Sequence, residues 1–243
     1  MTAVVVQARL DSCRLEKKSL LPLDREPLVF RVMEVLNFIP CDLRVLACPE
    51  DCVTVFAPFA ERAGFELSVG SKDDVLSRYC VAIRRFGIDR VIRATADNPF
   101  VFADAADFLN REAISLNADY AGYSGLPYGA GVESVNAEAL LRAEREASLP
   151  PEREHVCPYL YSHPEWFQLH RPLAPREWQG PSLRVTVDTR EDYERAMILY
   201  RVLSEQSQEA QYKYNGRNII KTYHEVFCGK KTVRKRKLLA NIA

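Results

Sequence analysis

The order of apolar and polar positions predicts alternating strands and helices over the first half of the chain. Unalternating β-branched runs indicate strands buried on both faces, and apolar residues three and four apart indicate helices. The expected strands are 3–6, 43–48, 65–69 and 90–94, and the expected helices are 28–38, 51–63, 73–86 and 103–116. This alternation over short connections is typical of a mostly parallel, mixed α/β sheet flanked by helices.

The pattern changes after residue 117. Residues 118–135 are rich in Gly and Tyr and predict short strands and turns. Strands are further expected at 166–173 and 183–188, and helices at 136–147, 153–163 and 189–204. We therefore expect one domain over 1–205 with an inserted β-rich arm at about 118–175, followed by a C-terminal extension over 206–243.

Composition and charge narrow the class of protein. The chain of 243 residues has no net charge, and no apolar run approaches the roughly 20 residues that cross a bilayer. The apolar stretch at the N-terminus lacks a basic start, which argues against a signal peptide and favours a cytoplasmic protein. The basic end over 229–243 is interpreted as a solvated tail or the start of a linker, and nucleic acid is not an expected partner.

The cysteines do not indicate a metal site. Among the seven, Cys48 and Cys52 form the only close pair. Zinc would need further ligands, for which His155, Cys157 and His163 are the candidates. Free thiols of a cytosolic protein are the interpretation that we favour.

A basic loop follows the first expected strand, at the sheet edge where parallel sheets bind ligands. Guanidinium and ammonium groups, with a hydroxyl at Ser12, suit a polyphosphate. The cations of this loop are Arg9, Arg14, Lys17 and Lys18. The loop has no glycine, which disfavours P-loop kinases and GTPases. A solvated charged turn is the alternative.

Two aspartates stand at the ends of expected strands. Asp97 follows the strand over 90–94 and precedes Asn98-Pro99, and Asp188 ends the strand over 183–188. Each alone is compatible with a turn or a helix cap. Together, two carboxylates opposite a cationic loop favour Mg²⁺ binding and nucleotidyl transfer.

Several motifs occur in a collinear order over about residues 3–200. They are A-R-x-x-S-x-R-L-x-x-K at 8–18, P-L at 27–28, G-S-K-D-D-V-L-S-R-Y at 70–79, T-A-D-N-P at 95–99, P-Y-G-A-G-V-E at 127–133, E-H-V-C-P-Y at 154–159 with H-P at 163–164, and V-D-T-R-E-D-Y at 187–193. This set resembles the CMP-sugar synthetases, which are the CMP-KDO and acylneuraminate cytidylyltransferases. The resemblance extends most of all to their SpsF-like relatives of spore-coat polysaccharide synthesis.

The resemblance implies a glycosyltransferase-A-like (nucleotide-diphospho-sugar transferase) fold that transfers CMP from CTP to a small acceptor and releases pyrophosphate. It implies catalytic roles for Lys18, Arg14 and Asp97, and Mg²⁺ at Asp97 and Asp188. The implied nucleotide-binding residues are Ala8, Arg9, Ser12, Arg14, Lys18, Ser71, Arg78 and Thr95. Acceptor contacts are expected from Tyr128, Glu133 and His155, in an arm that also forms a homodimer contact.

The chain departs from the family pattern at two places. Glu16 and Lys17 stand where relatives commonly have proline and glycine, and Glu26 replaces a lysine before Pro27. Both changes predict a weakened triphosphate site. The alternatives are therefore a module that kept the fold without catalysis, or a glycosyltransferase, which the missing D-x-D pair at Asp97 disfavours.

Overall fold

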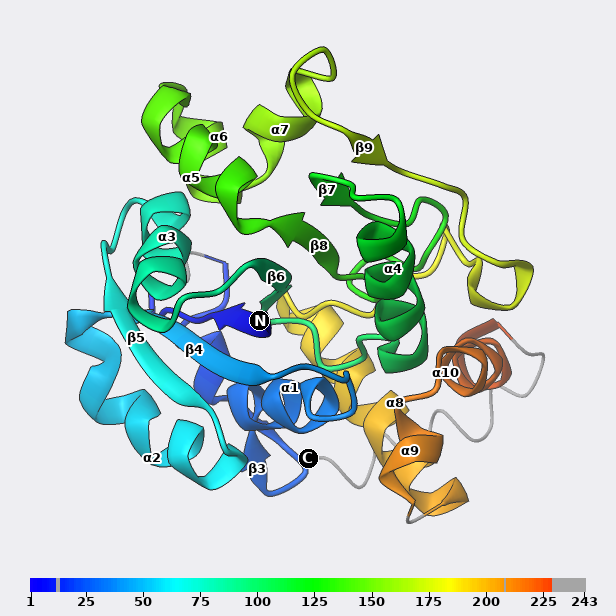
Figure 1. Cartoon of the computed structure of the whole chain (residues 1–243). Helices are drawn as coiled ribbons and strands as arrows, with labels where there is room; N and C mark the ends of the chain where they lie inside the picture. The colour runs from blue at the N-terminus through cyan, green and yellow to red at the C-terminus, as the bar shows by residue number, and fades with distance from the viewer. Residues whose placement is uncertain (12–13, 208, 229–243) are drawn as a thin grey trace.

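A seven-stranded sheet forms the centre of the structure (Figure 1). The structure is a computed structural model, and it describes residues 1–11, 14–207 and 209–228. The sheet order is β5-β4-β1-β6-β8-β7-β9, with bounds β1 Thr2–Gln7, β4 Leu43–Pro49, β5 Glu66–Gly70, β6 Arg90–Thr95, β7 Tyr120–Ala121, β8 Glu133–Asn136 and β9 Leu169–His170. Among the described strands of this sheet, β8 alone runs antiparallel to its neighbours. The expected mostly parallel mixed sheet is confirmed.

Helices cover both faces of this sheet. They are α1 Leu28–Leu36, α2 Val53–Ala63, α3 Val75–Phe86, α4 Ala103–Ser115, α5 Ala137–Glu146, α6 Pro150–His155, α7 Pro158–Ser162, α8 Arg190–Gln206, α9 Ala210–Lys213 and α10 Gly216–Tyr223. In β1, Val4 and Val6 pack with α1, α2 and α4, whereas Ala3 and Val5 pack with α3 and α5. Because both sets are buried, the strand reads as a continuous apolar run.

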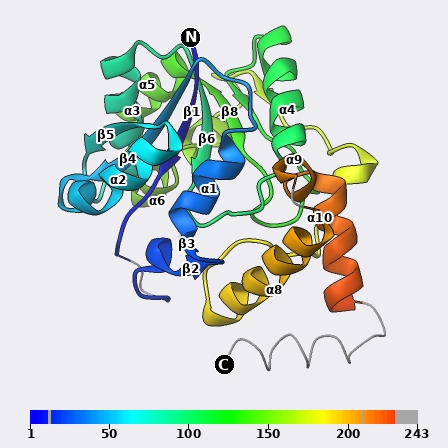
Figure 2. The same ribbon diagram turned by 90° about the horizontal axis from the view of Figure 1, so that it is seen from below.

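A third apolar cluster lies beside the sheet and includes the start of the predicted extension. It joins α8 and α10 to the small hairpin of β2 (Pro22–Leu23) and β3 (Glu26–Pro27). Figure 2 shows α8 and α10 together, away from α3 and α5. Ile219 and Tyr223 of α10 are buried in this cluster. The described part of the extension therefore packs on the main body, and the division at residue 205 stays a prediction.

The segment over 118–175 adds strands to the main sheet. Its strands β7, β8 and β9 continue the sheet beyond β6, and α5, α6 and α7, which come between β8 and β9 in the sequence, pack beside α3. The helix expected over 153–163 is divided into α6 and α7, because Val156 has a positive φ of 74°. Of the strand expected over 166–173, only β9 forms.

Residues 183–188 are extended but join no sheet, contrary to the expectation. Their partners are single residues from elsewhere: Tyr128 pairs with Arg184, and Val187 N–H donates to Asp97 O at 2.9 Å. The contact with Asp97 brings Asp188 to the end of β6. Pro58 lies within α2 without ending it, and α2 ends at Gly64 as expected.

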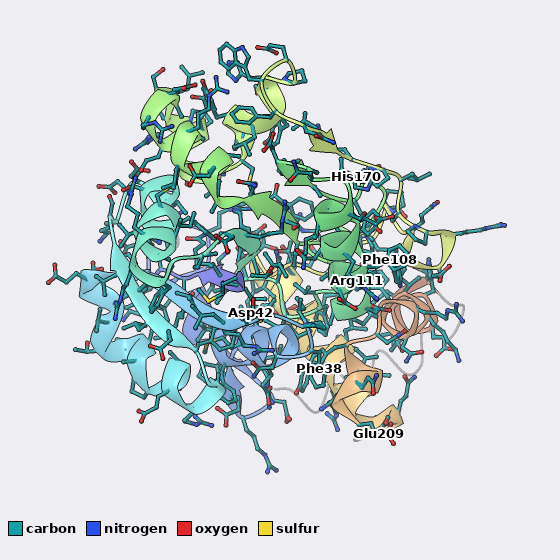
Figure 3. The ribbon with its side chains drawn as sticks, in the orientation of Figure 1. Phe38, Asp42, Phe108, Arg111, His170 and Glu209 are labelled. Atoms are coloured by element: carbon teal, nitrogen blue, oxygen red, sulfur yellow. The ribbon has the colours of Figure 1, made fainter. Side chains whose placement is uncertain are left out.

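The edge strand β9 is fixed to α4. His170 Nε2 lies 3.4 Å from Glu112 Oε2, and Tyr123 Oη donates to the same oxygen at 2.6 Å. Figure 3 shows His170 above the labelled α4 residues Phe108 and Arg111. Searched over the described residues, no helix is long and apolar enough to cross a membrane.

Candidate active site

The carboxyl ends of β1 and β6 lie side by side, because Gln7 and Thr95 are paired in register. The basic loop leaves β1 there, and Asp97 follows β6. A cavity of about 230 Å³ lies between them, and we call it the loop pocket. Its lining is Gln7, Ala8, Arg9, Asp11, Arg14, Leu15, Lys18, Ser19, Ala96, Asp97 and Asp188. The position agrees with the ligand sites of parallel sheets.

A second cavity of about 400 Å³, the outer pocket, adjoins the loop pocket. Both are lined by Gln7, Arg9, Arg14, Lys18, Asp97 and Asp188. The outer pocket adds Thr95, Tyr128 and His155 among its walls. The two cavities thus form one cleft with the carboxylates at its centre, and most of the predicted site residues line it. Ser12 lies outside the described residues.

Lys18 joins the two aspartates. Its Nζ donates to Asp97 Oδ2 at 2.7 Å and to Asp188 Oδ1 at 2.9 Å. All three side chains are largely removed from solvent, with exposed fractions of 18 %, 24 % and 10 % for Lys18, Asp97 and Asp188. Burial alone would lower the pKa of the Lys18 ammonium, but the two carboxylates outweigh it and raise that pKa above its usual value.

Asp188 contacts two further cations. Arg184 Nη2 donates to Asp188 Oδ2 at 2.8 Å, and Arg14 Nη2 lies 3.5 Å from Asp188 Oδ1. Burial opposes ionisation of Asp188, but Lys18 and the two guanidinium groups outweigh it, so its pKa is lowered. The cleft therefore compensates its buried negative charge with the chain's own cations.

Asp192 holds this arrangement from the first turn of α8. It accepts hydrogen bonds from Arg184 Nε at 2.9 Å and from the N–H groups of Asp188 and Thr189 at 3.2 Å. Asp192 N–H donates in return to Thr189 Oγ1 at 3.2 Å, which completes a capping box at the start of this helix. The cap of α8 thus orients the carboxylate of Asp188.

Thr95 orients Asp97 from the other side. Its hydroxyl donates to Asp97 Oδ1 at 2.6 Å and accepts from Asn98 Nδ2 at 2.9 Å. Because the single hydroxyl proton goes to Asp97, Asn98 must turn its NH₂ group to Thr95. Asn98 Oδ1 is then buried with no partner among the described residues. Thr95 therefore supports a carboxylate as well as lining the outer pocket.

Ser71 and Arg78 lie away from the cleft. Arg78 is fully buried, and its guanidinium donates to Ser71 O, to Lys72 O at 2.9 Å and to Gln7 Oε1 at 3.3 Å. Arg78 thus supports the loop after β5. Ser71 lines a separate open cavity with Asp51 and Lys72. Nucleotide contact by Ser71 or Arg78 stays a prediction, and the buried Arg78 can affect a ligand through the backbone and the Gln7 side chain that it holds.

The residues predicted to face the acceptor divide between two cavities. Tyr128 and His155 line the outer pocket. Glu133 lines a neighbouring cavity of about 240 Å³, the inner pocket, where it binds Arg93 and accepts from Tyr120 Oη at 2.8 Å. The outer and inner pockets share Arg93, Thr95, Asn98 and Gly131 as a common wall. The expected acceptor residues Glu133 and His155 therefore lie in two adjoining cavities that share a wall.

The two departures from the family pattern do not reach the cleft. Glu16 is exposed and lines none of these pockets. Glu26 lies on β3 and forms an ion pair with Arg62 at 2.7 Å. Lys17 has φ 46°, so it adopts the left-handed turn that glycine would favour. The expected weakening of the triphosphate site by these acidic residues has no support in their positions.

The donor set at the centre of the cleft suits a hard divalent cation. Asp97 and Asp188 both offer carboxylate oxygens to one point, which Lys18 now bridges. Over the described residues, no group of three or more His, Cys, Asp or Glu side chains is placed to hold a metal. Two carboxylates are the protein ligands expected where nucleotide phosphates complete an Mg²⁺ shell. Cys48 and Cys52 are buried free thiols, as expected.

Sequence reasoning missed two arginines of the site. Arg184 forms ion pairs with Asp188 and Asp192, but it lies in the extended segment before α8, where a spacing of four or eight residues does not indicate ion pairs. Arg93 lies opposite Glu133 in the β6–β8 register, which no local pattern indicates. The sequence indicates Arg93 and Arg184 only as members of the expected strands over 90–94 and 183–188.

A mostly parallel sheet with paired carboxylates and a cationic loop at one edge is an arrangement that suits nucleotidyl transfer. The family model described as cytidylyltransferase matches residues 3–227 of the chain. The chain therefore belongs to the cytidylyltransferase family, and it is a CTP-dependent nucleotidyltransferase. The match includes the loop after β1, the end of β6 and the segment before α8, which together line the loop pocket.

Similar proteins agree with this assignment. The spore coat polysaccharide biosynthesis protein SpsF of Bacillus subtilis is 31 % identical over 83 % of this chain and 87 % of its own length. A cytidylyltransferase from Leptospira borgpetersenii has a TM-score of 0.82 at 23 % identity, over 92 % of this chain and 94 % of that one. A CMP:2-keto-3-deoxy-manno-octonic acid synthetase complexed with CTP has a TM-score of 0.65 at 14 % identity, over 83 % and 98 %.

The free energy of unfolding is predicted to depend on ionised Asp192. Burial raises its pKa, but Arg184 and the surrounding N–H donors lower it overall, below the unfolded value of about 4. A depressed folded pKa stabilises the protein above the unfolded pKa, and this stability is lost as pH falls through the folded pKa. Asp192→Asn should cost about 2 kcal/mol at pH 7.

The measurement is urea unfolding of both proteins from pH 7 to pH 2. The difference between wild type and Asp192→Asn should shrink below about pH 4. Glu194→Gln is the control, because Glu194 forms an exposed helix pair with Arg190, and its effect should stay below about 0.5 kcal/mol. A pH-independent difference for Asp192→Asn would contradict the assignment.

Proposed function

We propose that this protein transfers CMP from CTP to a small acceptor such as a sugar acid, with release of pyrophosphate, for the synthesis of a polysaccharide or glycoconjugate. The contact of Lys18 with both Asp97 and Asp188 carries the proposal, because it places a movable cation and two metal-binding carboxylates at one point of the cleft. The SpsF relative and the CTP complex of the octonic acid synthetase support this choice.

The loop pocket is assigned to the triphosphate of CTP. Arg9 and Arg14 are partly or largely exposed, with side-chain exposed fractions of 45 % and 70 %, so they can turn towards phosphates. Arg9 is paired with Glu154 at 3.3 Å, a weak surface contact that an anion can replace. Ala8 lines the same pocket with its backbone close to β1.

Lys18 changes partners when the nucleotide binds. A polyphosphate brings more negative charge than the two carboxylates, so it draws Lys18 away from Asp97 and Asp188. Those carboxylates are then free to hold Mg²⁺ together with the phosphates. When bound, the metal neutralises charge on the phosphates and polarises them. The chain's own cation thus keeps the carboxylates together until the substrate arrives.

The reaction is an in-line substitution at phosphorus. An oxygen of the acceptor forms a bond to the α-phosphorus while the bond from that phosphorus to the bridging oxygen breaks. Pyrophosphate leaves with the bonding electrons, and the acceptor proton passes to solvent. Lys18 and Arg14 stabilise the charge that grows on the leaving oxygens.

The outer pocket is assigned to the acceptor, beside the α-phosphate. Tyr128 is largely exposed at its mouth, and its ring lies against Arg184 at 4.7 Å. The guanidinium group of Arg184 therefore contacts both Tyr128, on the acceptor side of the cleft, and Asp188. The homodimer and the cytoplasmic location implied by the family stay predictions, as does a base contact by Ser71.

The first test is isothermal titration of CTP with Mg²⁺ into wild type, Asp97→Asn and Asp188→Asn. Binding should need Mg²⁺ and weaken about tenfold or more in each variant, since each removes one metal-binding carboxylate. Asp42→Asn is the control, because the Asp42 carboxylate accepts from Thr2 N–H at the far end of the sheet and lines none of the three pockets of the site. Equal CTP affinity in all four proteins, or preference for UDP- or GDP-sugars, would reject the proposal.

The second test uses Lys18→Met with Lys17→Met as the matched control, because Lys17 is exposed and lines no described pocket. Without nucleotide, Lys18→Met should bind Mn²⁺ about tenfold more tightly than wild type, since the carboxylates lose their competing cation. Its CTP affinity should fall by a similar factor. Electron paramagnetic resonance of free Mn²⁺ measures the first effect, and unchanged Mn²⁺ affinity would refute the exchange.

A further inference from the structure

The link between α6 and α7 contains a strained turn. Val156 has φ 74° and ψ −56°, and Cys157 N–H donates to His155 O at 2.9 Å. These values define a γ-turn of positive φ, which is rare and strained. Lys17, Asp24, Arg25 and Asn117 also have positive φ, but Val156 is the only β-branched residue among the described non-glycine residues that do. A β-branched residue in this region is an outlier that calls for a cause.

The surrounding structure prevents this turn from relaxing. Val156 is fully buried and Cys157 is 1 % exposed, and both pack in the cluster of α3, α5 and α7. Val156 N–H donates to Glu152 O at 3.2 Å. The guanidinium group of Arg153 binds the Asp74 carboxylate, which anchors α6 to the start of α3. Strain that is held in this way is found mainly at functional sites.

The two residues flanking Val156 face two different cavities. His155 is exposed and lines the outer pocket, and its ring has no hydrogen-bond partner within the described chain. On the other side, the Cys157 thiol is buried near Glu133, a residue of the wall of the inner pocket. Burial raises the pKa of this thiol, so it stays protonated as a donor. A relaxed Val156 would rotate both adjoining peptides and displace both contacts.

The wall between the outer and inner pockets has unused hydrogen-bonding groups. Arg93 Nε and Asn98 Oδ1 are buried and have no partner among the described residues. One is a donor and the other an acceptor, and a hydroxyl group can serve both. Arg93 is already paired with Glu133, so this wall offers no net positive charge to a second anion. Buried groups of this kind are normally satisfied by a ligand or by water.

We propose that Val156 is a positioning residue for the acceptor: its strained turn fixes His155 at the outer pocket and Cys157 against the Glu133–Arg93 pair. The acceptor places a hydroxyl-bearing, uncharged end against Arg93 and Asn98, and His155 contacts the part nearer the nucleotide. This proposal rests on the proposed function, because it assumes that the outer pocket receives the acceptor.

The experiment compares Val156→Gly with Val156→Ala in the full chain. Both remove the isopropyl group, but only glycine adopts positive φ without strain. At an ordinary position glycine is the less stable of the two, so a melting temperature that is higher for Val156→Gly identifies the strain. Asn117→Gly is the matched control, since Asn117 has φ 49° after α4 and lines no described pocket.

The second readout is steady-state kinetics of pyrophosphate release, with 3-deoxy-manno-octulosonate and N-acetylneuraminate as probe acceptors. For Val156→Gly, the KM of the acceptor should rise about tenfold or more while the KM of CTP changes less than about twofold. Asn117→Gly should leave both constants unchanged. A lower melting temperature for Val156→Gly than for Val156→Ala, or an unchanged acceptor KM, overturns the proposal.

A wild type that binds CTP but uses neither probe would count against the sugar-acid acceptor, and the turn is then tested without one. Reaction of the folded proteins with dithiobis(nitrobenzoate), followed by mass spectrometry of the Cys157 peptide, reports the contact with Glu133. Cys157 should react faster in Val156→Gly than in wild type or Asn117→Gly. Equal rates in all three proteins overturn the positioning role.

Discussion

The contact of one ammonium group with two buried carboxylates holds the site of this protein together. Asp97 and Asp188 come from segments that share no continuous sheet, and like charges brought this close would repel each other without a cation between them. Lys18 supplies that cation from the loop after β1. A single charge balance therefore couples the positions of three segments, which are the loop after β1, the end of β6 and the segment before α8.

The same charge balance links the proposed binding of the nucleotide to the folded structure around Asp97 and Asp188. Arg184 and Asp192 fix Asp188 from the helix side, and Thr95 fixes Asp97 from the strand side, so the carboxylates stay in place when Lys18 leaves. A rigid pair of carboxylates with one movable cation is a preorganised arrangement, since little of the protein has to move when charge arrives. The proposed activity thus requires movement of side chains only, those of Lys18, Arg9 and Arg14.

The central sheet could be predicted because its strands are long β-branched runs, whose burial on both faces depends little on distant contacts. The two-residue strands β7 and β9 are too short to show a period, and residues 183–188 are extended only because Tyr128 and Asp97 pair with them. Asp97 could be found because it follows a strand end, Lys18 because it lies in a cationic loop after a strand, and Asp188 because it ends a β-branched run. The surroundings of the acidic departures could not be predicted, because the partner of Glu26 on the β2–β3 hairpin is Arg62 of a distant helix. Neither the Arg93–Glu133 pair nor the Val156 turn has a local sequence signal.

A crystal structure of the protein with CTP and Mg²⁺ tests the central claim most directly, because the claim concerns the partners of one nitrogen atom. The account predicts that Lys18 Nζ contacts the phosphates and that Asp97 and Asp188 both bind the metal. It is contradicted if Lys18 still bridges the two carboxylates while CTP is bound. In that case the contact would be a permanent structural ion pair, and the metal would have to bind elsewhere.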